Sequence, residues 1–299
     1  PPYAPVSELQ EKYGSPNPKG LMEYISTCKR EFKPQTKFQY SCLNYITLQH
    51  IIETITGQSL RDFAKENIFD ILGMQYTDYL PTIQQQDGKW INTVACPWMD
   101  RIAPTEKQKD GSVLCGQVHD PLARILNGGI SGNAGIFSNA NDIGILAAAL
   151  LNGGEYNGRR ILSPLGVKTM CTVPRELTAF GRTPGWDIFS PYASNKGDLF
   201  SPNTFGHTGY TGTSIIIDPD NDTAVILLVN AVHPEDRHSI VRLRSLVANA
   251  VAASICPPAQ VYTDHYYKRF LQFETETPIS PKDIVMVGNS LTEMEQAPK

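Results

Sequence analysis

The sequence predicts an α+β fold, in which an antiparallel sheet is flanked by helices and a separate helical region is built from residues 40–150. The first observation is a pair of apolar, β-branched runs at 214–218 and 223–230, separated by a Pro-Asp-Asn-Asp turn that favours an antiparallel hairpin. The second is residues 235–255, where apolar residues recur at helical spacing next to that hairpin. An amphipathic helix must bury its apolar face, so we expect it to cover the sheet.

The helical region is predicted from start and stop signals. A first helix would end at Gly57, and Ser59 with Asp62 three residues later would cap the next one. A third helix at 141–151 is followed by two glycines, and a short helix is expected around 21–30. Residues 81–135 carry turn residues without sustained periodicity, which predicts an irregular excursion that could shape a substrate cleft. Four apolar residues share one face of the first helix: Leu48, Ile51, Ile52 and Ile55.

Composition excludes several classes of function. The 299 residues are 41% hydrophobic and 19% charged, an ordinary globular balance for about two domains or one large domain with an appendage. The net charge is −4 and no segment concentrates basic residues, so we expect no nucleic-acid partner. The longest uncharged apolar stretch, residues 143–151, is about half of what a bilayer span requires, so we expect no membrane span. Oligomeric state is left open.

The cysteines and histidines do not form metal-binding patterns. None of the six cysteines forms a C-x-x-C pair, which argues against zinc-ribbon and thioredoxin-like sites. No histidines stand at metal-ligand spacing. We therefore expect neither a metal nor an organic cofactor, while disulfides stay open.

Two short motifs could carry chemistry, Tyr40-Ser41-Cys42 and His207-Thr208-Gly209. They lie in phrases that follow one another along the chain: FQYSCLNYITLQHIIETITG, ENIFDILGMQYT, HDPLARILNGGISGNAGIFSNANDI and FGHTGYTGTSIIIDPDNDTAVILLVN. On these phrases residues 1–255 resemble the serine β-lactamase-like superfamily, in the branch of class C β-lactamases, D-Ala-D-Ala peptidases and related esterases.

The resemblance implies acyl transfer from an ester or amide to water through a serine acyl-enzyme, with Ser and Lys from an S-x-x-K helix. Tyr40 would relay the proton, His207 would stand where many relatives have a strand Lys, and the N–H of Tyr210 would donate to the oxyanion. The substrate would be a small-molecule or cell-envelope ester or amide, in the periplasm or outside the cell. Four residues would contact the substrate: Cys42, Thr208, Gly209 and Tyr210.

Two positions depart from the family pattern. Cys42 replaces the Asn of Y-x-N, which puts the substrate specificity in question. His207 exchanges a permanent cation for an imidazole whose ordinary pKa is about 6.5. Ionising a phenol at neutral pH requires lowering its pKa from about 10 to about 7, which is about 4 kcal/mol of electrostatic help. Either the S-x-x-K lysine provides most of that help, or Tyr40 stays protonated and acts as a hydrogen-bonded relay.

The nucleophile is not identified among these residues. The one S-x-x-K match, which starts at Ser26 and ends at Lys29, lies much closer to Tyr40 than the family's nucleophile does. We therefore expect the true Ser and Lys to lie upstream, and this chain by itself to be inactive. Ser131-Gly132-Asn133 matches the S-x-N of penicillin-binding proteins, but its glycine-rich surroundings favour a packing role.

The end of the chain resembles a second family. Residues 283–293 (DIVMVGNSLTE) are similar to the first block of GDSL/SGNH hydrolases, and Ser290 would be that block's nucleophile. The predicted organisation is a hydrolase domain at 1–256, a linker at 257–281 and the start of an SGNH domain at 282–299. The alternative is a non-catalytic binding module with the same fold, which would lack the S-x-x-K helix in the full gene too.

Overall fold

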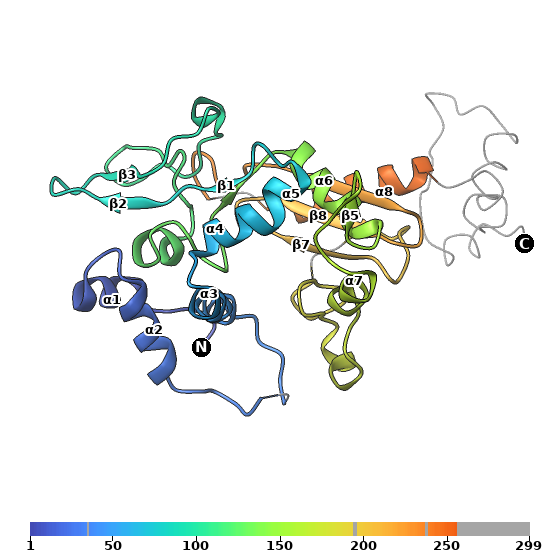
Figure 1. The fold of residues 1–299 in the computed structure, drawn as a ribbon, viewed down its shortest axis with the longest axis horizontal. Coiled ribbons are helices and arrows are strands. Elements are labelled where there is room, and N and C mark those ends of the chain that lie inside the picture. The colour runs from blue at the N-terminus through green and yellow to red at the C-terminus, as the bar shows by residue number, and fades with distance from the viewer. Residues whose placement is uncertain (35, 194–195, 237–238, 256–299) are drawn as a thin grey trace, which may run out of the picture. The chain divides into compact units, whose positions relative to one another are not determined.

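The computed structural model describes residues 1–34, 36–193, 196–236 and 239–255, and Pro1–Val251 form one compact unit (Figure 1). Its main sheet has three antiparallel strands in the order β7 (Phe205–Thr208), β8 (Ser214–Asp218) and β9 (Thr223–Leu227). The α+β class and the predicted hairpin are confirmed, although β9 ends three residues earlier than expected.

Two helices cover opposite faces of this sheet, α6 (Ala140–Leu151) and α8 (Val241–Ile255) (Figure 1). Successive side chains of a strand point to opposite faces, so neighbouring residues of β8 divide between the two layers. Ile217 belongs to the apolar cluster that includes α6, and Ile216 belongs to the cluster that includes α8. The helix expected at 235–255 therefore covers the sheet as predicted, but it begins at Val241.

The apolar spacing at 235–255 predicts more buried residues on α8 than the structure has, because some of the apolar residues counted in it are exposed. Val247 packs towards the sheet beside the fully buried Ala248, whereas Leu243 and Leu246 are exposed. Arg244 is buried in the same row. The apolar pattern misplaced the buried face because it could not include a charged residue.

Three helices at the start of the unit pack on one another: α1 (Val6–Tyr13), α2 (Pro18–Thr27) and α3 (Cys42–Thr56). Asn17 caps α2 by accepting a hydrogen bond from the Gly20 N–H at 2.7 Å, so this helix starts earlier than predicted. The end of α3 is as predicted, because Gly57 adopts a φ of 70° that few other residues tolerate.

The helix α3 buries a different face from the one its apolar periodicity marks. Leu48, Ile51 and Ile55 are exposed, and the buried row includes Ile46 and Gln49. The Gln49 amide donates to the Ile130 carbonyl and accepts from the Gly132 N–H. This polar network, which the apolar pattern cannot contain, fixes the rotation of the helix.

The remaining helices connect this region to the sheet. A continuous helical segment consists of α4 (Leu60–Ala64), the π-helical η1 (Lys65–Phe69) and α5 (Asp70–Leu72), and the Ser59 hydroxyl caps it as predicted. Asn139 caps α6. The other short elements are α7 (Pro164–Cys171), the 3-10 helices η2 (Met99–Arg101) and η4 (Arg175–Phe180), and the π-helical η3 (Leu122–Leu126).

Three two-stranded antiparallel sheets complete the unit: β1 (Asp78–Tyr79) with β4 (Ile136–Phe137), β2 (Thr82–Gln84) with β3 (Trp90–Asn92), and β5 (Glu155–Tyr156) with β6 (Arg159–Arg160). The expectation that residues 81–135 lack regular structure is thus wrong in part, because β2, β3, η2 and η3 fall there. Each is too short to show a period in the sequence.

Residues 252–299 form a second unit, of which the structure describes only 252–255. The predicted linker at 257–281 and residues 282–299, Ser290 included, lie outside the described residues, and the domain boundaries stay predictions. Among the helices that the structure describes, none combines the length and the apolar character needed to cross a membrane.

Candidate active site

The structure brings Tyr40 and His207 together. Tyr40 lies two residues before α3, His207 lies on β7, and their ring centroids are 6.4 Å apart. The start of α3 is held in place because the Ser41 hydroxyl donates to the Pro1 carbonyl at 2.9 Å and the Cys42 N–H donates to the Pro2 carbonyl at 3.0 Å. Tyr40 is thereby positioned over the end of the strand.

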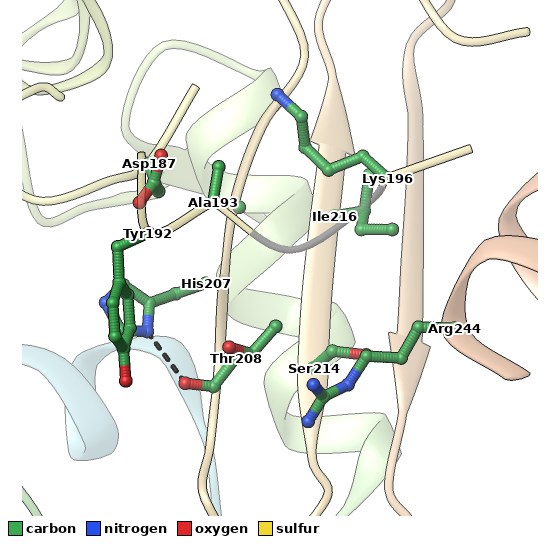
Figure 2. Close-up of a pocket in the computed structure, with 10 residues that line it drawn as sticks. Asp187, Tyr192, Ala193, Lys196, His207, Thr208, Ser214, Ile216 and Arg244 are labelled. Carbon is green, nitrogen blue, oxygen red and sulfur yellow. Dashed lines mark hydrogen bonds between the residues drawn. The ribbon is translucent and has the colours of Figure 1, made fainter. Parts of the chain in front are cut away.

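The partners of His207 define its tautomer. A guanidinium can only donate hydrogen bonds, so Arg182 Nη2, which lies 2.7 Å from His207 Nε2, requires Nε2 to accept. The imidazole proton is therefore on Nδ1, which donates to the Thr208 carbonyl at 3.0 Å (Figure 2). Burial, and then the Arg182 charge, lower the pKa of His207 below its ordinary value. His207 is a neutral imidazole at pH 7.

Arg182 contacts both rings. Its guanidinium lies 5.5 Å from the centroid of the Tyr40 ring, within cation–π distance, and its Nη1 makes an ion pair with Asp187 at 2.9 Å. Asp187 in turn exchanges backbone hydrogen bonds with Gly206 of β7. Through Asp187 the guanidinium is held against the strand that carries His207. It places a positive charge beside the neutral imidazole.

The Tyr40 phenol is held in its protonated form. Burial raises the pKa of Tyr40 to about 12, and the opposing effect of Arg182 is smaller. The Tyr192 ring stacks on Tyr40 with centroids 4.4 Å apart and an interplanar angle of 10°, which limits contact between the phenol and water. Among the described residues, the groups around Tyr40 therefore favour the protonated phenol.

Cys42 lies beside the phenol and against the glycine-rich segment. Burial raises the pKa of the Cys42 thiol, and side-chain hydrogen bonds with Asn133 and Tyr40 oppose that effect. The amide that the third position of Y-x-N lacks is therefore present next to it, on Asn133. Ser131 is buried and its hydroxyl donates to the Asn133 side chain at 2.7 Å, which agrees with the packing role expected for it.

The outer edge of β7 carries the next two predicted residues. Gly206 directs its backbone N–H and C=O outward, to Asp187, and backbone groups alternate in direction along a strand, so those of Thr208 also point to the outer edge. The Gly209 N–H turns inward to the Thr213 carbonyl at 2.8 Å. The next N–H on the outer side is that of Tyr210, and no described residue accepts a hydrogen bond from it.

Gly209 leaves room for a neighbouring side chain of the turn. A Cβ at this position would overlap the Thr213 hydroxyl, so a larger residue would require that hydroxyl to move. The Tyr210 side chain is 75% exposed, stacks on His119 with centroids 5.6 Å apart and donates its hydroxyl to Asp236. Tyr210 thus presents only its backbone to the strand edge.

The alternative nucleophile Ser26 makes no contact with the described residues of this site. The Ser26 hydroxyl donates to the Glu23 carbonyl of its own helix at 2.8 Å, and none of its contacts among the described residues involves Tyr40 or His207. Ser290 lies outside the described residues. Within the described part of the chain, His, Cys, Asp and Glu side chains form no group of three that could hold a metal ion.

Three residues of the site were not identified from the sequence. Arg182 and Asp187 flank a Pro-Gly turn and form an antiparallel bridge, so that turn was a signal that they face each other. Arg244 stands in the apolar row of α8, and a charged residue in such a row is a signal in itself. Figure 2 shows that Arg244, His207 and Thr208 line one pocket.

Known proteins are similar to this chain in sequence and in fold. Residues 1–249 match the family model described as Beta-lactamase. The chain is 35% identical over 226 residues to a protein of Escherichia coli (strain K12), covering 71% of this chain and 49% of that protein. It is 32% identical over 246 residues to one of Salmonella gallinarum, covering 78% and 54%. Both relatives carry the name "Putative D-alanyl-D-alanine carboxypeptidase".

The chain thus spans about half the length of these relatives. Among solved structures, a beta-lactamase from Mycobacterium bovis matches with a TM-score of 0.50 at 18% identity, covering 84% of this chain and 82% of that one, which shows the shared fold. The family match extends over the helical region, the main sheet and most of α8. The chain belongs to the beta-lactamase family.

Proposed function

We propose that this chain forms part of a serine hydrolase that transfers an acyl group from an ester or amide to water, with a serine and a lysine from outside the described residues. One observation carries the proposal. A protonated phenol and a neutral imidazole, distant in the sequence, meet at a strand edge beside an N–H that has no acceptor among the described residues. An acyl oxygen resting on that N–H would lie next to the group that moves the proton.

The protonated state of Tyr40 defines its proposed role. A phenol with a pKa of about 12 does not remove a proton by itself at neutral pH. It can accept the serine proton on its oxygen while it passes its own proton to the leaving group. No phenolate forms in this relay, and the proton count balances. The lysine of S-x-x-K would lower the barrier for the same transfer.

The substrate we propose first is a peptide that ends in D-Ala-D-Ala, because the relatives' names point to that class. A β-lactam or a small ester would enter the same acyl-transfer site. Peptides that end in D-Ala-D-Ala belong to the cell envelope, which supports a periplasmic or extracellular location for the complete protein.

The test is acyl labelling of the complete gene product with a fluorescent penicillin and a fluorophosphonate, followed by peptide mapping of the adduct and an assay of D-alanine release. Tyr40→Phe should reduce the acylation rate by roughly 10²–10⁴-fold, the usual contribution of a general acid–base group. Tyr156→Phe in β5 is the matched control and should acylate at the wild-type rate. An adduct on Ser26, abolished by Ser26→Ala, would contradict the proposed site.

The alternative of a binding module is the other outcome of this test. A complete gene product that binds a D-Ala-D-Ala peptide but takes no label on any serine would favour it. The proposed SGNH block is tested on its own: a fluorophosphonate adduct on Ser290 would support it, and labelling unchanged by Ser290→Ala would count against it.

A further inference from the structure

Arg244 is a buried cation that has no acidic partner among the described residues. Its side chain is 8% exposed, and no carboxylate pairs with it among the residues that the structure describes. Burial lowers the pKa of its guanidinium, and no neighbouring charge offsets that effect. Its Nε also has no hydrogen-bond partner there. Burying an unpaired charge is strongly unfavourable. The other contacts of Arg244 therefore indicate its role.

Those contacts are two backbone carbonyls of one turn. Arg244 Nη2 donates to the Gly209 carbonyl at 3.0 Å and to the Thr213 carbonyl at 3.1 Å. The same two carbonyls close the turn internally, because Thr213 accepts from the Gly209 N–H and Gly209 accepts from the Gly212 N–H. One side chain of α8 therefore holds both ends of the segment that follows β7.

The Gly209 carbonyl belongs to the same peptide group as the Tyr210 N–H. In a trans peptide the C=O and the N–H point in opposite directions. Since Arg244 and Gly212 hold the carbonyl on the inner side of the turn, the N–H is directed outward, to the edge of β7 where Thr208 also faces. A charge-assisted hydrogen bond to the carbonyl also polarises the peptide and makes its N–H a stronger donor.

We infer that Arg244 is a positioning residue, which aims and polarises the Gly209–Tyr210 peptide so that the Tyr210 N–H is preorganised for an acyl oxyanion. The catalytic part of this inference rests on the proposed function, whereas the hold on the peptide does not. Arg244 acts through the backbone from α8, because its Nη2 donates to the two carbonyls of the turn.

The first arm of the test observes the peptide directly. The complete gene product is labelled with ¹⁵N-tyrosine, and the Tyr210 amide is followed in wild type, Arg244→Met and Arg244→Lys. Arg242→Met, which changes an exposed arginine of the same helix, is the matched control. We expect Arg244→Met to shift the Tyr210 amide resonance, because the carbonyl of the same peptide loses its charge-assisted hydrogen bond. An amide that does not change in Arg244→Met overturns the inference.

The second arm measures catalysis and separates positioning from general stability. Arg244→Met should lower kcat by roughly 10²–10³-fold with little change in KM, as loss of an oxyanion donor does. Affinity for a boronic acid that forms a tetrahedral serine adduct should fall in parallel, and Arg242→Met should leave all three values unchanged. If Arg244→Met does not fold, Arg244→Lys decides, because its ammonium should preserve the Tyr210 amide position and part of the rate.

Failure of the proposed function and failure of the inference about Arg244 give different experimental results. A wild-type protein that takes no acyl label overturns the proposed function and, with it, the catalytic purpose of Arg244, while the Tyr210 amide still decides whether the peptide is held. A protein that acylates normally and keeps its kcat and boronate affinity in Arg244→Met overturns this inference and leaves the proposed function standing.

Discussion

Arg182 donates a hydrogen bond of 2.7 Å from Nη2 to His207 Nε2, so the imidazole carries its proton on Nδ1. The same guanidinium pairs with Asp187 and lies over the Tyr40 ring. One arginine, whose side chain is 12% exposed, thus fixes the tautomer of the strand histidine and brings a permanent charge next to the phenol. The histidine is a hydrogen-bonding element of the strand edge, and the charge belongs to Arg182.

The first prediction is that Arg182→Gln raises the pKa of His207. The Arg182 charge lowers that pKa, so its removal favours the imidazolium, and the freed Asp187 carboxylate acts in the same direction. The measurement is an NMR titration of the imidazole nitrogens, which in wild type should show a proton on Nδ1 at neutral pH. Arg182→Lys should keep the pKa lower than Arg182→Gln, and Arg175→Gln, an exposed position in η4, should change nothing. An unaltered titration in Arg182→Gln would remove the electrostatic role.

The second prediction concerns stability in acid. Burial and Arg182 lower the pKa of His207 in the folded state, so the unfolded chain binds the proton first as the pH falls. The stability that the neutral His207 preserves is fully present above the unfolded pKa of about 6.5. It is lost as the pH falls from there through the lower folded pKa. Urea unfolding at about pH 7.5 and about pH 5.5 should show a smaller loss for His207→Gln than for wild type. His119, whose pKa burial also lowers, should account for part of the loss that remains.

Local signals in the sequence predicted the elements that depend on local chemistry. The turn at 219–222 formed a hairpin, Ser59 capped a helix and Gly57 ended one, because each acts within a few residues. The rotation of α3 did not follow its apolar pattern, because the Gln49 amide contacts a segment about 80 residues away.

The residues of the candidate site also fall into two groups, those that a local motif identifies and those that only tertiary contacts identify. Tyr40 and His207 could be named because each lies in a recognisable motif, and the fold brings them together. Arg182 and Arg244 belong to no motif. Their roles come from tertiary contacts, one with an imidazole nitrogen and one with a backbone carbonyl, and a sequence does not encode such contacts at any fixed spacing.

The third prediction compares two glycines. A Cβ at Gly132 would overlap the Tyr45 carbonyl of α3, whereas a Cβ at Gly144 in α6 meets no atom within 4 Å. Gly132→Ala should lower the free energy of unfolding by about 1–3 kcal/mol, the usual cost of overpacking. Gly144→Ala should raise it by about 0.5–1 kcal/mol, because alanine favours a helix interior. Urea unfolding of both variants checks the pair, and equal effects would contradict the close packing of residues 127–135 on α3.

The fourth prediction is that Tyr40 does not ionise in the range where free tyrosines do. Burial raises its pKa to about 12, so at about pH 11 the native protein should lack the tyrosinate absorbance of this residue, although a phenol of ordinary pKa of about 10 would be mostly ionised. The measurement is the ultraviolet difference between wild type and Tyr40→Phe along an alkaline titration, with the same pair in urea as the control in which Tyr40 titrates normally.

Adding Arg182→Gln should move this ionisation to still higher pH, because the Arg182 charge is the element of the site that opposes the effect of burial. A wild-type minus Tyr40→Phe difference that already appears near pH 10 in the native protein, where ordinary phenols ionise, would mean that the phenolate is accessible. The proton would then be removed by an ionised Tyr40, and the relay through a protonated phenol would have to be abandoned even if the enzyme is active.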